Sequence, residues 1–140
     1  MFIIRQSTAI AVIIGPFVDN TDGFTPEGAL VIVQADVRLS KNGGNYAQKN
    51  DANACVHNEN GWYVCQLDIT DTNTLGRLEL AAFVAGALPV WHEFLVVSAN
   101  VWDSLFGTDK LQVDIVQLDG DPVGDSIIIS VNDLKRIVLG

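Results

Sequence analysis

Basic residues are few in this sequence. Eight Lys and Arg residues stand against seventeen Asp and Glu in 140 residues, which gives a net charge of −9 and a pI near 4.3. The only adjacent basic pair is Lys135-Arg136. Binding to a nucleic acid or to an anionic membrane surface depends on clustered cations. The composition therefore argues against both kinds of partner.

A membrane-spanning segment is also missing, because no apolar run approaches the roughly 20 residues that a spanning helix needs. The start, MFIIRQSTAIAVIIGPFV, imitates a signal peptide. However, the apolar group Phe2-Ile3-Ile4 precedes Arg5, and no small-x-small cleavage site follows. We therefore expect a retained β-strand here and no insertion into a membrane.

Residues that carry catalysis or bind metals are few. Cys55, His57, Cys65 and His92 could in principle bind zinc, but their spacing matches no usual zinc motif. The acidic loops at 19–23 and 119–121 lack the alternating ligands of a calcium loop, and turn chemistry explains them better. No nucleophile elbow or phosphate-binding loop is present. We expect no enzyme, no metal and no cofactor.

The two cysteines flank a predicted turn at Glu59-Asn60-Gly61. A three-residue hairpin loop would place Cys55 opposite Cys65, within reach of a disulfide, whereas a two-residue turn would shift the pair by one position. We favour a reduced, buried pair.

Helical signals are scarce, and what is present is a β pattern. Short runs rich in Val and Ile recur every eight to twelve residues between Gly, Asn, Asp and Pro. This predicts an all-β protein, an antiparallel β-sandwich of immunoglobulin-like or jelly-roll-like type. The expected strands lie near 8–14, 30–33, 36–40, 45–48, 54–57, 62–67, 76–83, 89–97, 110–118 and 126–131. One short helix is expected at 98–106, with Ser98 as its cap and Gly107 as its end.

The length fits one domain with an appendage. We expect a β-sandwich domain at 1–118 and a C-terminal β arm or assembly segment at 119–140, so that extended β-segments lie at both ends of the chain. The stretch IGPFVDNTDGFTPEGAL, residues 14–30, is predicted to connect two strands. In this interpretation Phe17 and Val18 return to the core, turns follow at 19–23 and 25–28, and Leu30 begins the next strand.

The chain is unusually apolar, with 49% hydrophobic and 18% charged residues and a mean hydropathy of +0.27. We therefore expect apolar surface that is buried on assembly, in a homo-oligomer or against a partner. Trp62 and Tyr63 must point to opposite faces of a strand, and we expect Trp62 in the core and Tyr63 at the rim. The candidate interface residues are Phe2, Ile3, Ile4, Tyr63, Trp102, Ile127, Ile129 and Val131.

Four segments in this order, IGPFVDNTDGFTPEGAL, ADVRLSKNGGNYAQKN, NGWYVCQLDITDTNTLG and ALPVWHEFLVVSANVWDSLFGTDKLQVDIVQLDG, carry a resemblance. The chain resembles, over about residues 8–120, the N-terminal module of structural proteins encoded among the virion genes of tailed bacteriophages. The resemblance implies a non-enzymatic virion component, made in the host cytoplasm, whose partners are capsid, neck or tail proteins. It carries over no catalytic residues.

Members of that family often continue into repetitive β or fibre-like sequence, whereas the given sequence ends with SIIISVNDLKRIVLG, residues 126–140. That difference favours an adaptor, a short fibre or a capsid decoration protein over a full adhesin. The alternative is a carbohydrate-binding module for host attachment, since an all-β fold with exposed aromatic side chains is a common platform for a host glycan. Trp62, Tyr63, Trp91 and Trp102 are the available aromatic residues for it.

Overall fold

The computed structural model describes residues 2–110, 117–118 and 121–122. The chain divides into two units between Lys110 and Leu111. In the second unit, β9 (Gln117–Leu118) and β10 (Asp121–Pro122) form a short antiparallel pair. The expected division after residue 118 falls in this unit and stays a prediction. The expected β-run at 126–131 lies outside the described residues.

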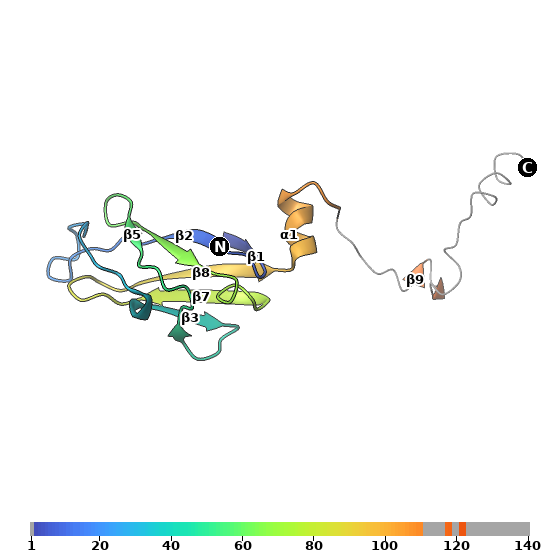
Figure 1. Ribbon diagram of the computed structural model, residues 1–140, viewed down its shortest axis with the longest axis horizontal. Helices are drawn as coiled ribbons and strands as arrows, with labels where there is room; N and C mark the ends of the chain where they lie inside the picture. The colour runs from blue at the N-terminus through green and yellow to red at the C-terminus, as the bar shows by residue number, and fades with distance from the viewer. Residues whose placement is uncertain (1, 111–116, 119–120, 123–140) are drawn as a thin grey trace, which may run out of the picture. The chain divides into compact units, whose positions relative to one another are not determined.

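The larger of two sheets in the first unit has five strands (Figure 1). Its order is β1 (Phe2–Arg5), β8 (Val90–Val97), β7 (Gly76–Ala82), β3 (Val37–Lys41) and β4 (Ala47–Gln48). β1 runs parallel to β8, and the other pairs are antiparallel. Alternation sets the inner face, since Leu78, Leu80 and Ala82 of β7 are buried.

The smaller sheet is antiparallel, in the order β2 (Ile10–Ile14), β6 (Tyr63–Leu67) and β5 (Val56–His57). The core lies between the two sheets. From the smaller sheet it takes Val12 and Ile14 of β2 and every second residue of β6, which are Tyr63, Cys65 and Leu67. The expectation of an all-β, two-sheet fold with one short helix is confirmed.

The strand order is that of an immunoglobulin-type sandwich. In that fold one sheet has the order A-B-E-D and the other contains C, F and G. Here β2, β6 and β5 occupy the positions of B, E and D, while β4, β3, β7 and β8 follow the order C′-C-F-G. Strand β1 adds to the edge of the second sheet beside β8. In the described chain, no strand takes the A position beside β2.

Two Asn-Gly turns form the hairpins that the sequence predicts. Asn42 and Gly43 join β3 to β4, and Asn60 and Gly61 join β5 to β6, all four with positive φ. The second hairpin has the three-residue register, with Val56 opposite Val64. Tyr46, in the expected strand at 45–48, does not pack inward: β4 is a two-residue edge strand with both residues exposed, and Tyr46, just before it, is 46% exposed.

Helix α1 (Ala99–Phe106) directly follows β8, with Ser98 at its N-cap position and Gly107 at its C-cap, as expected. The guanidinium of Arg5 donates to both carboxylate oxygens of Asp103, at 3.2 and 3.3 Å, and so links the helix to β1. In Figure 1 the helix lies at one end of the sandwich.

The connection at residues 14–30 follows its predicted course for most of its length. Ile14 ends β2, Phe17 is buried, and the carboxylates of Asp19 and Asp22 accept hydrogen bonds from the backbone of the following turns. The expected strand at 30–33 is wrong. Only Ile32 forms a bridge, to Cys55 just before β5, and a 3-10 helix follows at Gln34–Asp36.

Candidate functional surface

An open groove runs along one long side of the sandwich, between the edge strands of the two sheets. On this side β1 pairs with Phe94–Val97 of β8, and within the described chain the first half of β8, Val90–Glu93, has no strand beside it. β2 is the edge of the other sheet. The gap has a volume of about 700 Å³ and is lined by Phe2, Ala11, Val12, Ile13, Trp91, His92, Glu93 and Phe94.

The pairing register shows which backbone groups of β2 face this groove. Cys55 donates its N–H away from β6, to the carbonyl of Ile32 at 2.9 Å. Cys55 and Cys65 therefore occupy a non-hydrogen-bonded position of their ladder, so the backbone groups of Cys65 point to the other side, toward Val12 of β2.

Because backbone direction alternates along a strand, the groups of Ala11 and Ile13 point away from β6 and into the open edge. The next residue in this alternation supports the assignment, since Gly15 donates its N–H across the gap to Nε2 of His92 at 3.0 Å. An unpaired strand edge of this kind is a template for an added strand.

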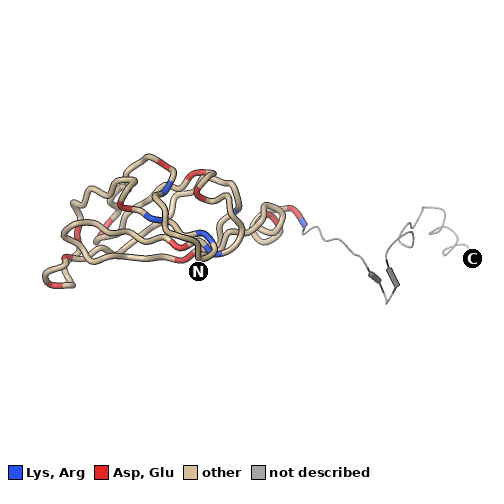
Figure 2. The backbone as a smooth tube through the Cα atoms, turned by 90° about the horizontal axis from the view of Figure 1, so that it is seen from below, with Lys and Arg blue, Asp and Glu red and all other residues tan. Residues whose placement is uncertain are grey.

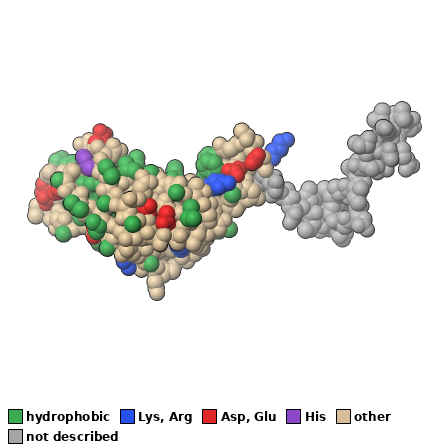
Figure 3. Space-filling model, in the orientation of Figure 1, with side chains coloured by type: hydrophobic (Ala, Val, Ile, Leu, Met, Phe, Trp, Pro, Cys, Tyr) green, Lys and Arg blue, Asp and Glu red, His purple; other side chains and the backbone are tan. Residues whose placement is uncertain are grey.

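Apolar side chains surround this edge. Trp91 is 75% exposed, Ile13 54% and Phe2 53%, and the Phe2 ring meets the buried ring of Phe94 edge-on at 6.3 Å. The one charged side chain, Glu93, pairs with Arg77 at 3.5 Å. Figure 3 shows apolar side chains spread across the visible face of the sandwich among few charged ones. The groove therefore suits an extended, uncharged segment better than an ion.

His92 is a polar side chain in the lining of the groove, held by a hydrogen bond from Gly15. Burial lowers the pKa of His92, and its Nε2 must be unprotonated to accept the hydrogen bond from Gly15. The ring also packs near Trp62, with centroids 6.3 Å apart. His92 thus ties β8 to the end of β2 as a neutral side chain.

The predicted interface residues fall into three groups. Phe2 lies in the groove, and Ile3, the next residue, is half-buried. Trp102 is half-buried on α1, with its ring centroid 5.1 Å from that of Phe106 and the two rings tilted by 48°. Ile127, Ile129 and Val131 lie outside the described residues. Ile4 is fully buried in the core, so it presents no surface to a partner.

The expectation that Tyr63 lies at the rim is wrong, because it is 1% exposed and Trp62 is the half-buried member of the pair. Tyr63 shares the inner face of β6 with Cys65 and Leu67. Its hydroxyl donates to the carbonyl of Glu27 at 2.8 Å and accepts from the N–H of Leu30 at 3.0 Å. The phenol therefore anchors the long connection after β2.

The candidate zinc ligands do not meet. The thiols of Cys55 and Cys65 are buried, free and side by side, as the three-residue loop predicts, whereas His57 is exposed and His92 lines the groove. Hydrogen bonding between the thiols lowers the pKa of Cys55 and, together with burial, raises that of Cys65. Among the residues described, no three His, Cys, Asp or Glu side chains are placed to hold a metal ion.

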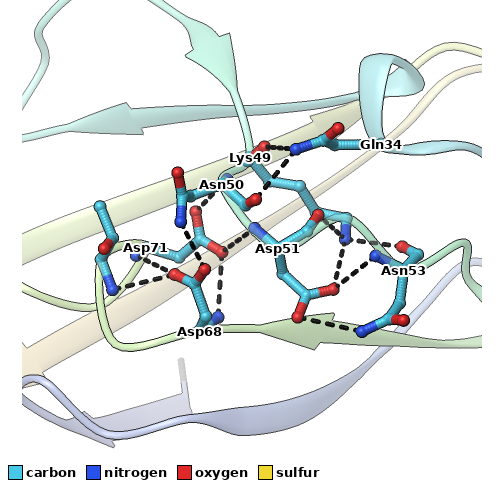
Figure 4. Close-up of polar contacts among 8 residues, drawn as sticks. Gln34, Lys49, Asn50, Asp51, Asn53, Asp68 and Asp71 are labelled. Carbon is cyan, nitrogen blue, oxygen red and sulfur yellow. Dashed lines mark hydrogen bonds and ion pairs between the residues drawn. The ribbon is translucent and has the colours of Figure 1, made fainter.

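A buried lysine, Lys49, lies on the opposite long side of the sandwich, just after β4. Figure 4 shows its contacts. Nζ of Lys49 donates to the carbonyls of Asp51 and Asn53, at 2.7 and 2.8 Å, and to the Asp51 carboxylate at 3.1 Å. Burial would raise the pKa of Asp51, but the N–H of Asn53 and the Lys49 ammonium outweigh it and hold that pKa below its usual value. All three donors of Lys49 are thus used.

The carboxylate of Asp71 holds the same crossing segment from the other direction. It accepts the N–H groups of Asn50, Asp51 and Asp68, at 2.6, 3.1 and 3.0 Å. Gln34 donates to the carbonyls of Lys49 and Asn50. In the part of the chain that the structure describes, no buried side-chain polar atom lacks a partner. This cluster has a structural role, because its hydrogen bonds hold the segment that crosses between the sheets.

Compared with family models, with curated proteins and with solved structures, the chain matches none of them. Across the described residues, no helix has the length and apolar character that crossing a membrane requires. Acidic residues outnumber basic ones along the described backbone (Figure 2). The surface itself must therefore support any functional conclusion.

Sequence reasoning did not name Ile13 or Trp91 as interface residues, although it counted Trp91 among the aromatic residues available for a glycan. Both lie in apolar strands whose every second residue is buried, and period-two alternation does place them on outer faces. The signal was present, but it could not show that the edge beside them stays open.

Proposed function

We propose that this chain is a non-enzymatic structural protein of a tailed-phage virion, a β-sandwich that assembles with other protein chains as an adaptor, a short fibre or a capsid decoration protein. The observation that carries the proposal is the groove between β2 and β8, where an open strand edge and exposed apolar side chains coincide. The resemblance of the four sequence segments to phage structural modules supplies the setting.

Protein assembly explains this combination economically. Trp91, Ile13 and Phe2 expose apolar surface that burial would stabilise by about 25 cal/mol per Å². The edge of β2 adds directional backbone bonds, which fix register and orientation. A soluble domain normally protects such an edge with charge, proline or a bulge, and β2, IAVII, contains no charged residue and no proline.

The direct test is to look for the protein in particles. Mass spectrometry and immunogold labelling of purified virions of the encoding phage should find the chain at a fixed copy number and at one location. A chain that is missing from the particles and that stays a stable monomer in isolation would overturn the proposal.

A carbohydrate-binding module is the second candidate, and the exposed indole of Trp91 favours it. A flat aromatic ring on a sheet edge can stack on a sugar. A glycan array probed with the purified chain should then show binding that Trp91→Ser removes and that Trp102→Ser leaves in place. No binding to host-surface glycans would remove this candidate.

A further inference from the structure

The groove is a missing strand position. In an immunoglobulin-type sandwich, strand A pairs with strand B at the edge of the A-B-E-D sheet. Here the corresponding sheet, β2-β6-β5, starts at B, and the space where A would lie is the groove of about 700 Å³. The N-terminal strand β1 does not fill it, because β1 pairs with β8 in the other sheet.

The open edge defines its occupant. The backbone groups of Ala11 and Ile13 point into it, so an added strand must be extended. By analogy with strands A and B of the immunoglobulin fold, we expect it to run antiparallel to β2. Val12 and Phe94 form an apolar floor, while Ile13 and Trp91 flank the outside. A suitable strand is therefore apolar on the face that enters the groove and carries an apolar residue beside Ile13 on the outer face.

We propose that this groove binds residues 126–131, SIIISV, of a second copy of the chain. The segment carries no charge and has three consecutive isoleucines, a pattern typical of a strand buried on both faces. In the complex, Ile127, Ile129 and Val131 enter the groove beside Val12, and Ile128 lies along Ile13.

The segment has the reach that exchange between copies requires. Ser126 follows Lys110 by 16 residues, and an extended chain of that length spans about 50 Å. Two other apolar runs lie in this region. LQVDI at 111–115 contains a charged residue, Asp114, and IVL at 137–139 has only three residues and directly follows Lys135-Arg136, so both fit the groove less well. The inference deepens the proposed function, on which it rests, by naming a second copy as the partner.

The test uses the full chain and variants on each side of the contact. Ala11→Pro removes the N–H that faces the groove without touching the β2–β6 ladder, and edge strands tolerate proline at such positions. Ala11→Ser keeps the N–H and is its control. Ile129→Asp puts a charge on the inserted face, and Ser130→Asp, which points to solvent in the complex, is the matched control.

Sedimentation equilibrium should show concentration-dependent association of the wild-type chain and of both controls. Ala11→Pro and Ile129→Asp should each weaken association by at least about tenfold, equivalent to 1.4 kcal/mol. Mixing these two variants should restore a 1:1 complex, because one retains a working segment and the other a working groove. Circular dichroism checks folding, and if Ala11→Pro unfolds, Ile129→Asp still decides.

A wild-type chain that stays monomeric at about 100 μM would overturn the inference. So would folded variants that associate as the wild type does, or a mixture that forms no complex. Detection of the chain in virions is a separate measurement, so failure here is distinguishable from failure of the proposed function.

Discussion

The two long sides of the sandwich differ in how the gap between the sheets is closed. On the β4–β5 side, residues 49–54 cross from the edge of one sheet to the edge of the other and fill the gap with the Lys49 contacts. On the β1–β2 side, the crossing is short, at 6–9. It is held at one end by Thr72, whose carbonyl and hydroxyl accept the N–H groups of Ser7 and Thr8.

The two sides therefore have different roles: one stabilises the fold, and the other is open to a binding partner. The closed side contains buried polar groups that are bonded to one another, so it specifies the fold. The open side consists of apolar side chains and an unpaired edge, so it adds little to the fold and can bind. Substitutions on the two sides should therefore act on different measurements.

The largest expected effect is on the closed side. Lys49→Met leaves the carbonyls of Asp51 and Asn53 without the ammonium donor and the Asp51 carboxylate without its cation, and the free energy of unfolding should fall by about 3 kcal/mol. Urea denaturation measures it. Lys41→Met, whose ammonium bonds at the surface, should cost less than about 1 kcal/mol. Equal losses for the two variants would show that the closed side is no special source of stability.

Gly61, in the turn between β5 and β6, gives the second test of stability. A Cβ on Gly61 would lie 2.3 Å from the carbonyl oxygen of Phe17, and its φ is +81°. Gly61→Ala should cost about 2 to 3 kcal/mol. Gly86 has a φ of +90° with no atom within 4 Å of a Cβ, and Gly86→Ala should cost about 1 kcal/mol. Thermal unfolding compares them, and equal losses would exclude a steric contribution from Phe17.

His92 gives the open side a modest pH dependence. Its pKa is lower in the folded state than in the unfolded state, so the unfolded chain binds more protons at mildly acidic pH. The His92 contribution is complete above the unfolded pKa of about 6.5 and is lost as the pH falls through the lower folded pKa.

Wild-type stability should accordingly fall between pH 7.5 and 5, and His92→Gln should fall less over the same range. Urea titrations at several pH values measure this difference. Parallel curves for the two proteins would show that the Gly15 contact does not depend on the protonation of His92.

The smallest effect on folding is expected at Trp91. Trp91→Ser removes an exposed side chain, so the free energy of unfolding should change by no more than about 0.5 kcal/mol, while association in sedimentation experiments weakens. A large loss of stability would show that Trp91 stabilises the fold, and it would contradict the proposed difference between the two sides.

The sequence predicted the local features of this molecule well. The Asn-Gly turns and the stop at Gly107 follow from backbone preferences, and the alternation of Leu78, Leu80 and Ala82 shows the inner face of β7 directly. Hairpin partners follow from adjacency, but the sequence left the loop length open, and the structure decides for the register that places Cys55 opposite Cys65.

Contacts between distant segments were not predictable in the same way. The parallel pairing of β1 with β8 joins the first and the last strand of the sandwich in sequence order, and no local pattern encodes it. From the sequence alone, Lys49 resembles a surface residue. In the structure it is buried, because the carboxylate of Asp71, from a later loop, holds the backbone of the crossing segment over it. The open groove is the least predictable feature, because it depends on which edge each of these strands leaves uncovered.

The parallel pairing of β1 with β8 also decides how the domain bears load. Phe2 and Val97 lie at opposite ends of this pair, so tension between Phe2 and Gly107 pulls the two strands along their length and strains all their hydrogen bonds together. Tension between Gly76 and Val97, at the same end of β7 and β8, would peel bonds one at a time. Single-molecule pulling should therefore find the higher rupture force for the first pair of handles, which makes the sandwich a mechanical link between its two ends.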